Sequence, residues 1–247
     1  MIKFSNVSLI YPNSTTTVLE NLNLTIAEGE LVLVIGPTGS GKSSLARMLV
    51  GVWPSMSGSI RLDDVDIFNW SKDELGAYLG YLPQGIELLE GSIAENISRF
   101  GELDEAQLQK AIELVGLTDF INNLPDKLAT QVGEDGTVFS GGQRQRLGLA
   151  RAIYGNPRFV VLDEPNANLD VEGNHALYKL LQHLKEAGTT VVVVTHKKDI
   201  LKYSDRILVM KGGKPKIFGP RDQVLDKLAG KEVKTITAEQ ASKLTSK

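Results

Sequence analysis

The chain opens with two short runs rich in β-branched and other apolar residues, Ile2 to Ile10 and Val18 to Ile26. A Pro-Asn-Ser-Thr segment within Pro12 to Thr16 lies between them. Because Pro, Asn and Ser favour turns between such runs, the pattern predicts that the two runs pair as antiparallel strands.

A second pattern begins at Leu31 to Ile35, which is apolar at every position. Phe159 to Leu162 and Val191 to Val194 are equally uninterrupted, and Ile207 to Met210 adds another strand-like run. Strands without polar positions are typical of parallel sheets covered on both faces. The expected fold is α/β, with a core made of a mostly parallel sheet and an antiparallel β part.

Helical patterns fill much of the remaining chain. Leu45, Met48 and Leu49 recur at helical spacing after a glycine-rich loop, and an amphipathic helix around Lys179 to Lys185 precedes the strand at Val191. Between about residues 72 and 156 we expect helices without matching buried strands, which indicates a helical lobe inserted into the core. The helical segments expected there are Ile93 to Ser98, Asp104 to Val115 and Gln143 to Tyr154.

Composition narrows the class of protein. The 247 residues include no cysteine, which excludes a disulfide scaffold and a thiolate zinc site. With 27 Lys and Arg against 30 Asp and Glu and no long basic run, the charge balance argues against a nucleic-acid-binding protein. The apolar runs are far shorter than the roughly 20 residues that span a bilayer, and Met1 to Phe4 does not begin a signal peptide. We therefore expect a soluble, intracellular chain.

The segment Gly36-Pro37-Thr38-Gly39-Ser40-Gly41-Lys42-Ser43 fits the P-loop pattern G-x-x-x-x-G-K-[ST]. It lies between a predicted strand and a predicted helix, where backbone N–H groups and the helix dipole can hold phosphate. Lys42 is expected to reach the β- and γ-phosphates and the Ser43 hydroxyl to bind Mg²⁺. The alternative, an ordinary glycine-rich turn with an exposed lysine, does not account for the complete pattern in this position.

Two carboxylates, Asp163 and Glu164, directly follow the apolar run that begins at Phe159. In a parallel sheet they lie at the carboxyl edge, beside the P-loop. Asp163 is expected to hold Mg²⁺ and Glu164 to orient or deprotonate a water molecule. Without the P-loop, a solvated loop would be the simpler interpretation of the two acids.

A second Ser/Gly-rich helix start, Ser140-Gly141-Gly142-Gln143, precedes the helix expected to begin at Gln143. A protein with one nucleotide pocket has no use for a second anion-binding helix end unless it faces the phosphate of another molecule. At this point the chain resembles the ATP-binding cassette (ABC) ATPases, whose signature is LSGGQ. Phe139 departs from the usual Leu, whereas Ser140 and Gly142 match.

The resemblance extends from Ile2 to about Leu228 and implies further roles. Tyr11 matches the aromatic residue that stacks on adenine, although a packed strand-end tyrosine is the alternative. Gln84 matches the glutamine loop that contacts Mg²⁺ and the attacking water. Asp170 matches the D-loop, in which Asn168 replaces a common alanine, and His196 matches the switch histidine at the γ-phosphate.

Each implied role has its own set of residues. The expected catalytic residues are Glu164, His196 and Gln84, and the expected metal ligands are Ser43, Gln84 and Asp163. The expected nucleotide-binding residues are Tyr11, Gly36, Pro37, Thr38, Gly39, Ser40, Gly41, Lys42, Ser43 and Ser44. Ser140, Gly141, Gly142 and Gln143 are expected to act on the nucleotide of a second copy. His175 and His183 match no motif, so we interpret them as surface or packing residues.

Several phrases of the sequence are similar to those of exporters. Thr130 to Gly136 looks like the exporter X-loop, which rests against transmembrane domains near Glu134. Three segments are similar to the ATPases of bacterial type I protein secretion, of the PrtD type: Gly51 to Pro54, Ala94 to Ile97 with Arg99 to Gly101, and Glu164 to Asn166 with Asn168 to Asp170. The family thus implies export of an unfolded polypeptide.

The expected organisation is a single ABC ATPase domain, with a P-loop NTPase core and an inserted helical subdomain. Residues 1–84 and 157–228 would form a RecA-like core that includes the N-terminal antiparallel part. Residues 85–156 would form the helical signature subdomain, and residues 229–247 a polar tail. We expect Met1 to be the start of an excised domain, with a separately encoded subunit as the alternative.

The resemblance implies a Mg²⁺-dependent ATPase that works as a head-to-tail homodimer with ATP sandwiched between the copies. Its partners would be the transmembrane domains of an exporter, in the same polypeptide, and a periplasmic adaptor reached through them. The domain would lie on the cytoplasmic face of the bacterial inner membrane. The alternatives are an exporter of lipid or peptide, a non-transport ABC ATPase of translation or chromosome maintenance, and a monomeric P-loop kinase for a small molecule.

Overall fold

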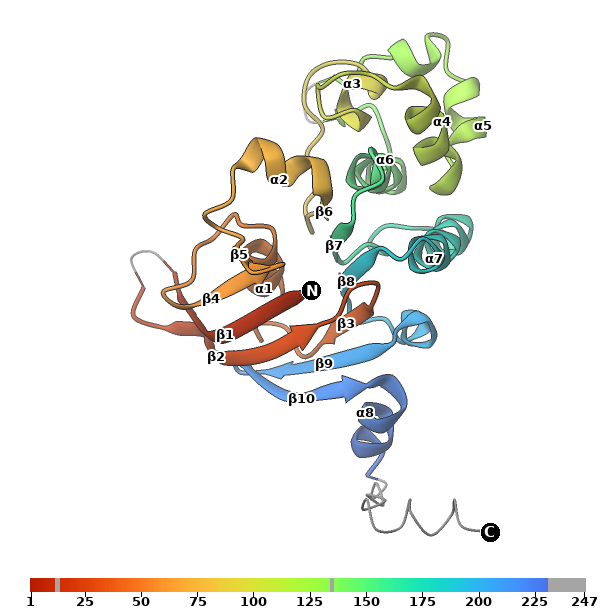
Figure 1. Cartoon of the computed structure of the whole chain (residues 1–247). Helices are drawn as coiled ribbons and strands as arrows, with labels where there is room; N and C mark the ends of the chain where they lie inside the picture. Colours follow the sequence, from red (N-terminus) through yellow and green to blue (C-terminus); the bar gives the residue numbers. More distant parts are fainter. Residues whose placement is uncertain (12–13, 134–135, 231–247) are drawn as a thin grey trace, which may run out of the picture.

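The computed structural model describes residues 1–11, 14–133 and 136–230. Two β-sheets lie next to each other, and helices cover the larger one (Figure 1). The predicted α/β class, with a mostly parallel sheet and an antiparallel part, is confirmed. Within the described ranges, no helix is long and apolar enough to cross a bilayer.

The smaller sheet is antiparallel and has the strand order β2-β1-β4-β5. The predicted pairing of β1 with β2 is confirmed, although Pro12 and Asn13 of the expected turn lie outside the described residues. Apolar side chains of β1 turn inward at Ile2, Phe4, Val7 and Leu9. The strands are β1 (Ile2–Ile10), β2 (Thr17–Ile26), β4 (Ser57–Leu62) and β5 (Val65–Asp66).

The larger sheet has the order β10-β9-β3-β8-β7-β6, and all its strands are parallel except β10. Every residue of β7 and β8 is buried, as their uninterrupted apolar sequences predict. The carboxyl ends of parallel neighbours meet at one edge, which collects the loops that follow these strands. The strands are β3 (Leu31–Ile35), β6 (Leu79–Leu82), β7 (Phe159–Asp163), β8 (Thr190–Val194), β9 (Arg206–Lys211) and β10 (Lys214–Pro220).

One strand contradicts the sequence interpretation. We expected no buried strand between about residues 72 and 156, yet β6 lies in this interval and pairs with β7 at the end of the sheet. It is only 4 residues long and contains Gly80 and Tyr81, so it lacks the uninterrupted apolar pattern of its neighbours. Its partner strand, 77 or more positions away in the chain, determines its conformation.

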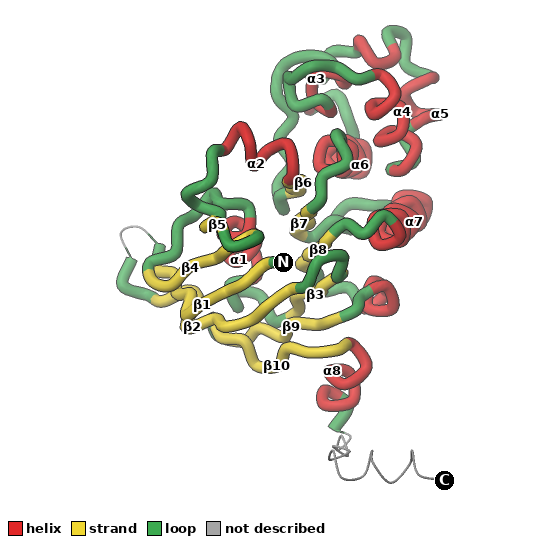
Figure 2. Tube along the Cα trace, in the orientation of Figure 1, coloured by secondary structure: helices red, strands yellow, loops and turns green. Residues whose placement is uncertain are grey.

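The described helices fall into two groups (Figure 2). One group packs beside the sheets and the other forms a cluster at the far end of β6 and β7 (Figure 1). The first comprises α1 (Lys42–Leu49), α2 (Lys72–Tyr78), α7 (Val171–Glu186), α8 (Arg221–Leu228) and the 3₁₀ helix η3 (Lys198–Tyr203). The second comprises α3 (Ile93–Ile97), α4 (Glu105–Leu114), α5 (Thr118–Asn122), α6 (Gly141–Ile153) and the 3₁₀ helix η1 (Lys127–Ala129).

The start of one expected helix differs from that observed. Helix α6 begins at Gly141 rather than at Gln143, because Ser140 caps it and Gly141 and Gly142 form its first turn. The C-terminal helix α8 extends to Leu228, and only Ala229 and Gly230 of the expected tail are described.

Strand β6 and helix α6 approach each other at Gly80. A Cβ atom there would lie 1.9 Å from the carbonyl oxygen of Ala152, which is backbone and cannot move independently. We predict that Gly80→Ala lowers the free energy of unfolding by about 1–3 kcal/mol, the usual cost of overpacking. Urea unfolding measures the change, and Gly76→Ala in α2, where a Cβ meets nothing within 4 Å, is the matched control. Equal stability of the two variants would contradict the close approach.

Candidate functional site

The polar residues predicted from the sequence gather at the carboxyl edge of the larger sheet. The P-loop follows β3, Gln84 follows β6, Glu164 follows β7 and His196 follows β8. Since β3 pairs with β8, β8 with β7 and β7 with β6, these loops lie next to one another. These loops therefore place charged and hydrogen-bonding side chains together at this edge, where the backbone hydrogen bonds of the sheet end.

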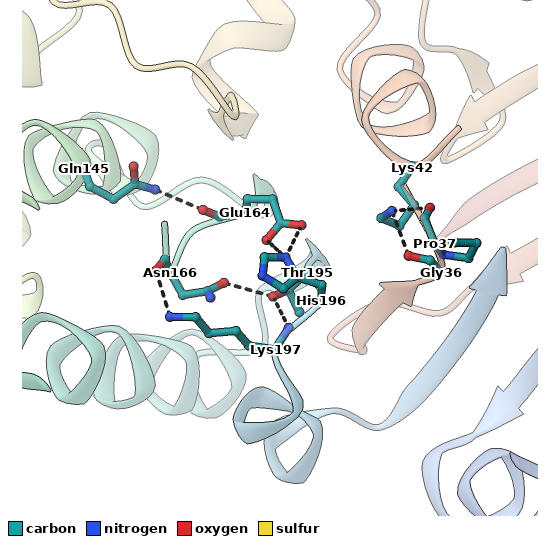
Figure 3. Close-up of polar contacts among 9 residues, drawn as sticks. All are labelled: Gly36, Pro37, Lys42, Gln145, Glu164, Asn166, Thr195, His196 and Lys197. Atoms are coloured by element: carbon teal, nitrogen blue, oxygen red, sulfur yellow. Dashed lines mark hydrogen bonds and ion pairs between the residues drawn. The ribbon is translucent and has the colours of Figure 1, made fainter. Parts of the chain in front are cut away.

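The P-loop turns sharply into helix α1. Gly41 is the N-cap residue of α1 and has φ of 91°, a left-handed conformation that suits glycine. The Lys42 ammonium donates hydrogen bonds to the carbonyl oxygens of Gly36 and Pro37, each 3.0 Å away (Figure 3). A cation held over a helix N-terminus provides the charge and the backbone donors that phosphate requires.

Asp163 is the last residue of β7 and is only 1% exposed. Burial raises the pKa of its carboxyl group, whereas a hydrogen bond from Ser43 and the positive charges of Arg47 and Lys42 oppose the shift. Its Oδ1 atom has no hydrogen-bond partner among the described residues. A buried carboxylate oxygen beside a hydroxyl fits Mg²⁺, which prefers oxygen ligands and would favour the ionised carboxylate.

Glu164 and His196 contact each other directly (Figure 3). His196 Nδ1 lies 3.0 Å from Oε1 and 2.9 Å from Oε2 of Glu164. The Glu164 side chain is 13% exposed and the His196 side chain 72% exposed, so a largely buried carboxylate contacts an exposed imidazole ring.

The backbone of Glu164 is also unusual. Its φ is 53°, in the left-handed region, which costs a non-glycine residue about 1–2 kcal/mol. Its N–H donates to the carbonyl oxygen of Val194 at 2.8 Å, and the side-chain amide of Gln145 donates to its carbonyl oxygen at 3.2 Å. Helix α6 therefore contacts the strained residue that carries the carboxylate.

A buried polar layer that the sequence interpretation missed supports this pair. Asn166 is 1% exposed, and its Oδ1 accepts a hydrogen bond from the Thr195 hydroxyl at 2.9 Å. The Lys197 ammonium donates to the Asn166 carbonyl oxygen at 3.3 Å. These contacts join the loop after β7 to the loop after β8. In the sequence, Asn166 was noted only as part of a segment similar to the family. A polar residue next to a buried strand already indicates a buried side chain that needs hydrogen-bond partners.

Tyr11 lies 37% exposed after β1. Its hydroxyl is 2.7 Å from that of Ser44, and its ring meets the edge of Trp53 with centroids 5.0 Å apart. The Arg47 guanidinium lies over the other ring, 4.8 Å from the Trp53 centroid. Trp53 was not among the expected site residues. Its contact with Tyr11 fixes the ring that could stack on a base.

The second glycine-rich segment lies at the start of α6, where Ser140 is the N-cap residue. The Ser140 hydroxyl accepts from the Gln143 N–H at 3.2 Å, and the Gln143 side chain accepts from the Ser140 N–H at 2.8 Å. Asn168 packs against Gly142, since a Cβ on Gly142 would lie 3.0 Å from the Asn168 carbonyl oxygen. Asp170 caps helix α7 through the Gly173 N–H at 2.7 Å.

The remaining predicted residues have simpler settings. Gln84 is exposed, His175 is exposed on α7 and His183 is half-buried on the same helix. Glu134 of the expected X-loop lies outside the described residues. Among the residues described, no group of three or more His, Asp or Glu side chains could hold a metal ion. A metal at Asp163 would therefore need hydroxyl, amide or phosphate oxygens as further ligands.

Comparisons with known proteins agree on the family. The protein-family model described as "ABC transporter" matches residues 19–167 of the chain. The chain is 45% identical over 215 residues to the type I secretion system ATP-binding protein PrsD of Rhizobium meliloti, covering 87% of this chain and 37% of that protein. It is 37% identical over 216 residues to the ATP-dependent lipid A-core flippase of Shewanella denitrificans, covering 86% and 36%.

A solved structure is also similar. The structure of a bacterial Atm1-family ABC exporter with ATP bound matches with a TM-score of 0.85 and 28% identity, over 100% of this chain and 42% of that one. The chain spans little more than a third of the length of the two curated relatives.

Proposed function

The chain belongs to the ABC transporter family as an ATP-hydrolysing exporter domain, and we propose that it powers the export of unfolded polypeptides by type I secretion. The observation that supports ATP hydrolysis is the convergence of Lys42, Asp163, Glu164 and His196 at one sheet edge. The 45% identity to PrsD, against 37% to the flippase, favours polypeptide as the cargo.

In the proposed reaction, P-loop N–H groups and Lys42 bind the phosphates of ATP. Mg²⁺ would be held by Ser43, Asp163 and Gln84, and it would neutralise charge on the phosphate oxygens. Glu164 accepts a proton from the water whose oxygen attacks the γ-phosphorus, and the bond to the β-phosphate oxygen breaks to leave ADP. His196 contacts the Glu164 carboxylate and would orient it, and its imidazole ring would also contact the γ-phosphate.

The active unit we propose is a head-to-tail dimer. Ser140 is exposed and lies at the N-terminus of α6, a helix end suited to anions. Ser140, Gly141, Gly142 and Gln143 of one copy would bind the γ-phosphate held by the P-loop of the other. Two-fold pairing then yields two equivalent sites, and loss of the γ-phosphate releases the copies.

The dimer would act on transmembrane domains that rest near Gln84 and the segment containing Glu134, in the same polypeptide. The domain would lie on the cytoplasmic face of the bacterial inner membrane, and a periplasmic adaptor would contact the transmembrane part. The shared length of little more than a third leaves room in the relatives for such segments.

A second candidate function is lipid export, which the similarity to a lipid A-core flippase favours. The two functions are distinguished by reconstituting the chain with its transmembrane domains in proteoliposomes. Polypeptide export predicts that an unfolded polypeptide stimulates ATP hydrolysis while added lipid A does not. Stimulation by lipid A alone would reject polypeptide as the cargo.

Tyr11 is predicted to bind the base by stacking. Tyr11→Ala should weaken ATP and GTP binding alike, by about 1–3 kcal/mol, whereas Tyr11→Trp should bind almost as well as the parent. Tyr11→Phe is the matched control, because it removes only the hydroxyl that contacts Ser44. Calorimetric titration measures all three variants. Strong loss of affinity in the Phe or Trp variant would show that the hydroxyl, not the ring face, dominates binding.

A further inference from the structure

Arg99 follows helix α3. In every described hydrogen bond of its side chain, the guanidinium group donates to a backbone carbonyl oxygen. Two acceptors belong to Gly76 and Leu79, at 2.7 and 3.1 Å. The other three belong to Arg151, Ala152 and Tyr154, at 3.0, 3.1 and 3.4 Å. Because a guanidinium group is planar and rigid, it fixes the position of one set of carbonyl oxygens relative to the other.

Both sets lie at helix C-termini. Gly76 is in the last turn of α2 and Leu79 is its C-cap residue, while Arg151 and Ala152 are in the last turn of α6. Carbonyls at these positions have no partner within their helix, and they form the negative end of the helix dipole. Arg99 thus satisfies both helix ends at once with a single cation. Burial and the nearby charge of Arg151 lower the pKa of Arg99, and the carbonyl oxygens offset that cost.

The backbone at this point is strained. Arg99 and Phe100 have φ of 58° and 59°, two successive non-glycine residues in the left-handed region. This conformation is unfavourable for a non-glycine residue and persists only where its surroundings impose it. The bond from the Phe100 N–H to the Glu95 carbonyl oxygen, at 2.8 Å, is one such constraint. The strain therefore serves to bring the Arg99 side chain to the two helix ends.

The two helices lead to different parts of the proposed site. Helix α2 continues directly into β6, which ends just before Gln84, and α6 begins at Ser140. We propose that Arg99 is a positioning residue that couples the orientation of α6, and with it the Ser140 end, to the strand that carries Gln84. The inference rests on the proposed function, because the orientation of Ser140 matters only if it meets the nucleotide of a second copy.

Arg99→Lys tests the coupling, because a lysine keeps the charge but is a point donor that cannot hold both helix ends. We expect kcat for ATP hydrolysis to fall by roughly 2- to 30-fold, the range of coupling effects from residues outside the ligand contacts. The KM for ATP should change less than about twofold, because the contacts of the P-loop and Tyr11 with ATP, which stabilise the ground state and the transition state equally, remain. In a Glu164→Gln background, Arg99→Lys should also reduce the amount of ATP-dependent dimer.

The matched control is Arg146→Lys, because Arg146 lies on the same helix α6 but bonds the Gly116 carbonyl oxygen at 3.0 Å, within the helical cluster. It should leave kcat, KM and dimer formation close to the parent. Thermal unfolding of each variant establishes that it is folded at the assay temperature. If Arg99→Lys is unfolded there, Arg99→Gln, which keeps two donors, replaces it with the same expectations.

An unchanged kcat and unchanged dimer formation in a folded Arg99 variant would overturn the inference. A rise in KM at constant kcat would overturn it as well, because the effect would then lie in ATP binding. Equal losses in the Arg99 and Arg146 variants would assign both residues to general packing of α6. If Glu164→Gln itself forms no dimer with ATP, the proposed sandwich fails instead, and the two failures are thereby distinguished.

Discussion

Replacing Glu164 by Gln is expected to slow ATP hydrolysis by about 10²–10⁴-fold and to accumulate a dimer in the presence of ATP. Gln has the size and shape of Glu but lacks the basic carboxylate that we propose accepts the proton of water. Its side-chain oxygen can still accept a hydrogen bond from His196, so the contact between the loops after β7 and β8 is retained. The loss is therefore confined to the chemical step.

The dimer accumulates for two reasons. Without hydrolysis, the γ-phosphate that would bridge the two copies stays in place. In addition, the negative charge of Glu164 next to Asp163, which acts to raise the pKa of Asp163, is gone, so like-charge repulsion around the triphosphate weakens.

Size-exclusion chromatography with Mg²⁺-ATP, Mg²⁺-ADP and no nucleotide measures the dimer, and phosphate release measures turnover. Glu186→Gln, the same substitution at the exposed C-terminal end of α7, is the matched control and should behave as the parent. Full ATPase activity of Glu164→Gln would show that another carboxylate acts as the base. A dimer with ADP or without nucleotide would contradict a γ-phosphate bridge.

The second large effect is expected from mixing two inactive variants. Lys42→Ala removes the ammonium that we expect to bind phosphate, and Ser140→Arg places a bulky side chain at the N-terminus of α6. In the mixed dimer both defects fall on one site and leave the other intact. An equimolar mixture should therefore recover up to about a quarter of the parent activity, because half of the dimers are mixed and each has one of two equivalent sites.

Ser140 also caps α6, so Ser140→Arg costs helix stability in addition to blocking the partner's phosphate. Ser140→Asp separates the two effects, since Asp is an equally good N-cap but repels phosphate. It should be as inactive alone, and as complementary to Lys42→Ala, as the Arg variant. Absence of recovery at concentrations where dimers form would mean that each copy completes its own site.

Those parts of the fold that follow from local pattern were predictable. Strands β3, β7 and β8 were recognisable from the apolar runs 31–35, 159–162 and 191–194, because a strand that is buried on both faces needs no polar positions. The P-loop was recognisable because its backbone conformation demands glycine at fixed positions. From these strands alone, Lys42, Asp163 and His196 could be placed at one edge, since parallel strands present their carboxyl ends together.

Other features depend on partners far away in the chain. Strand β6 is too short and too mixed in sequence to be recognised, and it forms because β7 offers it backbone hydrogen bonds. Trp53 contacts Tyr11 across 42 positions, which no periodicity reveals. In the sequence, Arg99 was noted only as part of a segment similar to the family. Its hydrogen bonds go to carbonyl oxygens of α2 and α6, and the sequence alone does not show that these two helix ends lie close together.

The left-handed backbone of Glu164 has a consequence for engineering this domain. Gly or Asn at that position would relieve the conformational cost and remove the carboxylate in the same step. A set of random variants selected only for thermal stability would therefore be enriched in proteins that have Gly or Asn at position 164 and do not hydrolyse ATP. Selection for robust yet working variants has to score turnover alongside melting temperature, because at this residue the two properties are in direct opposition.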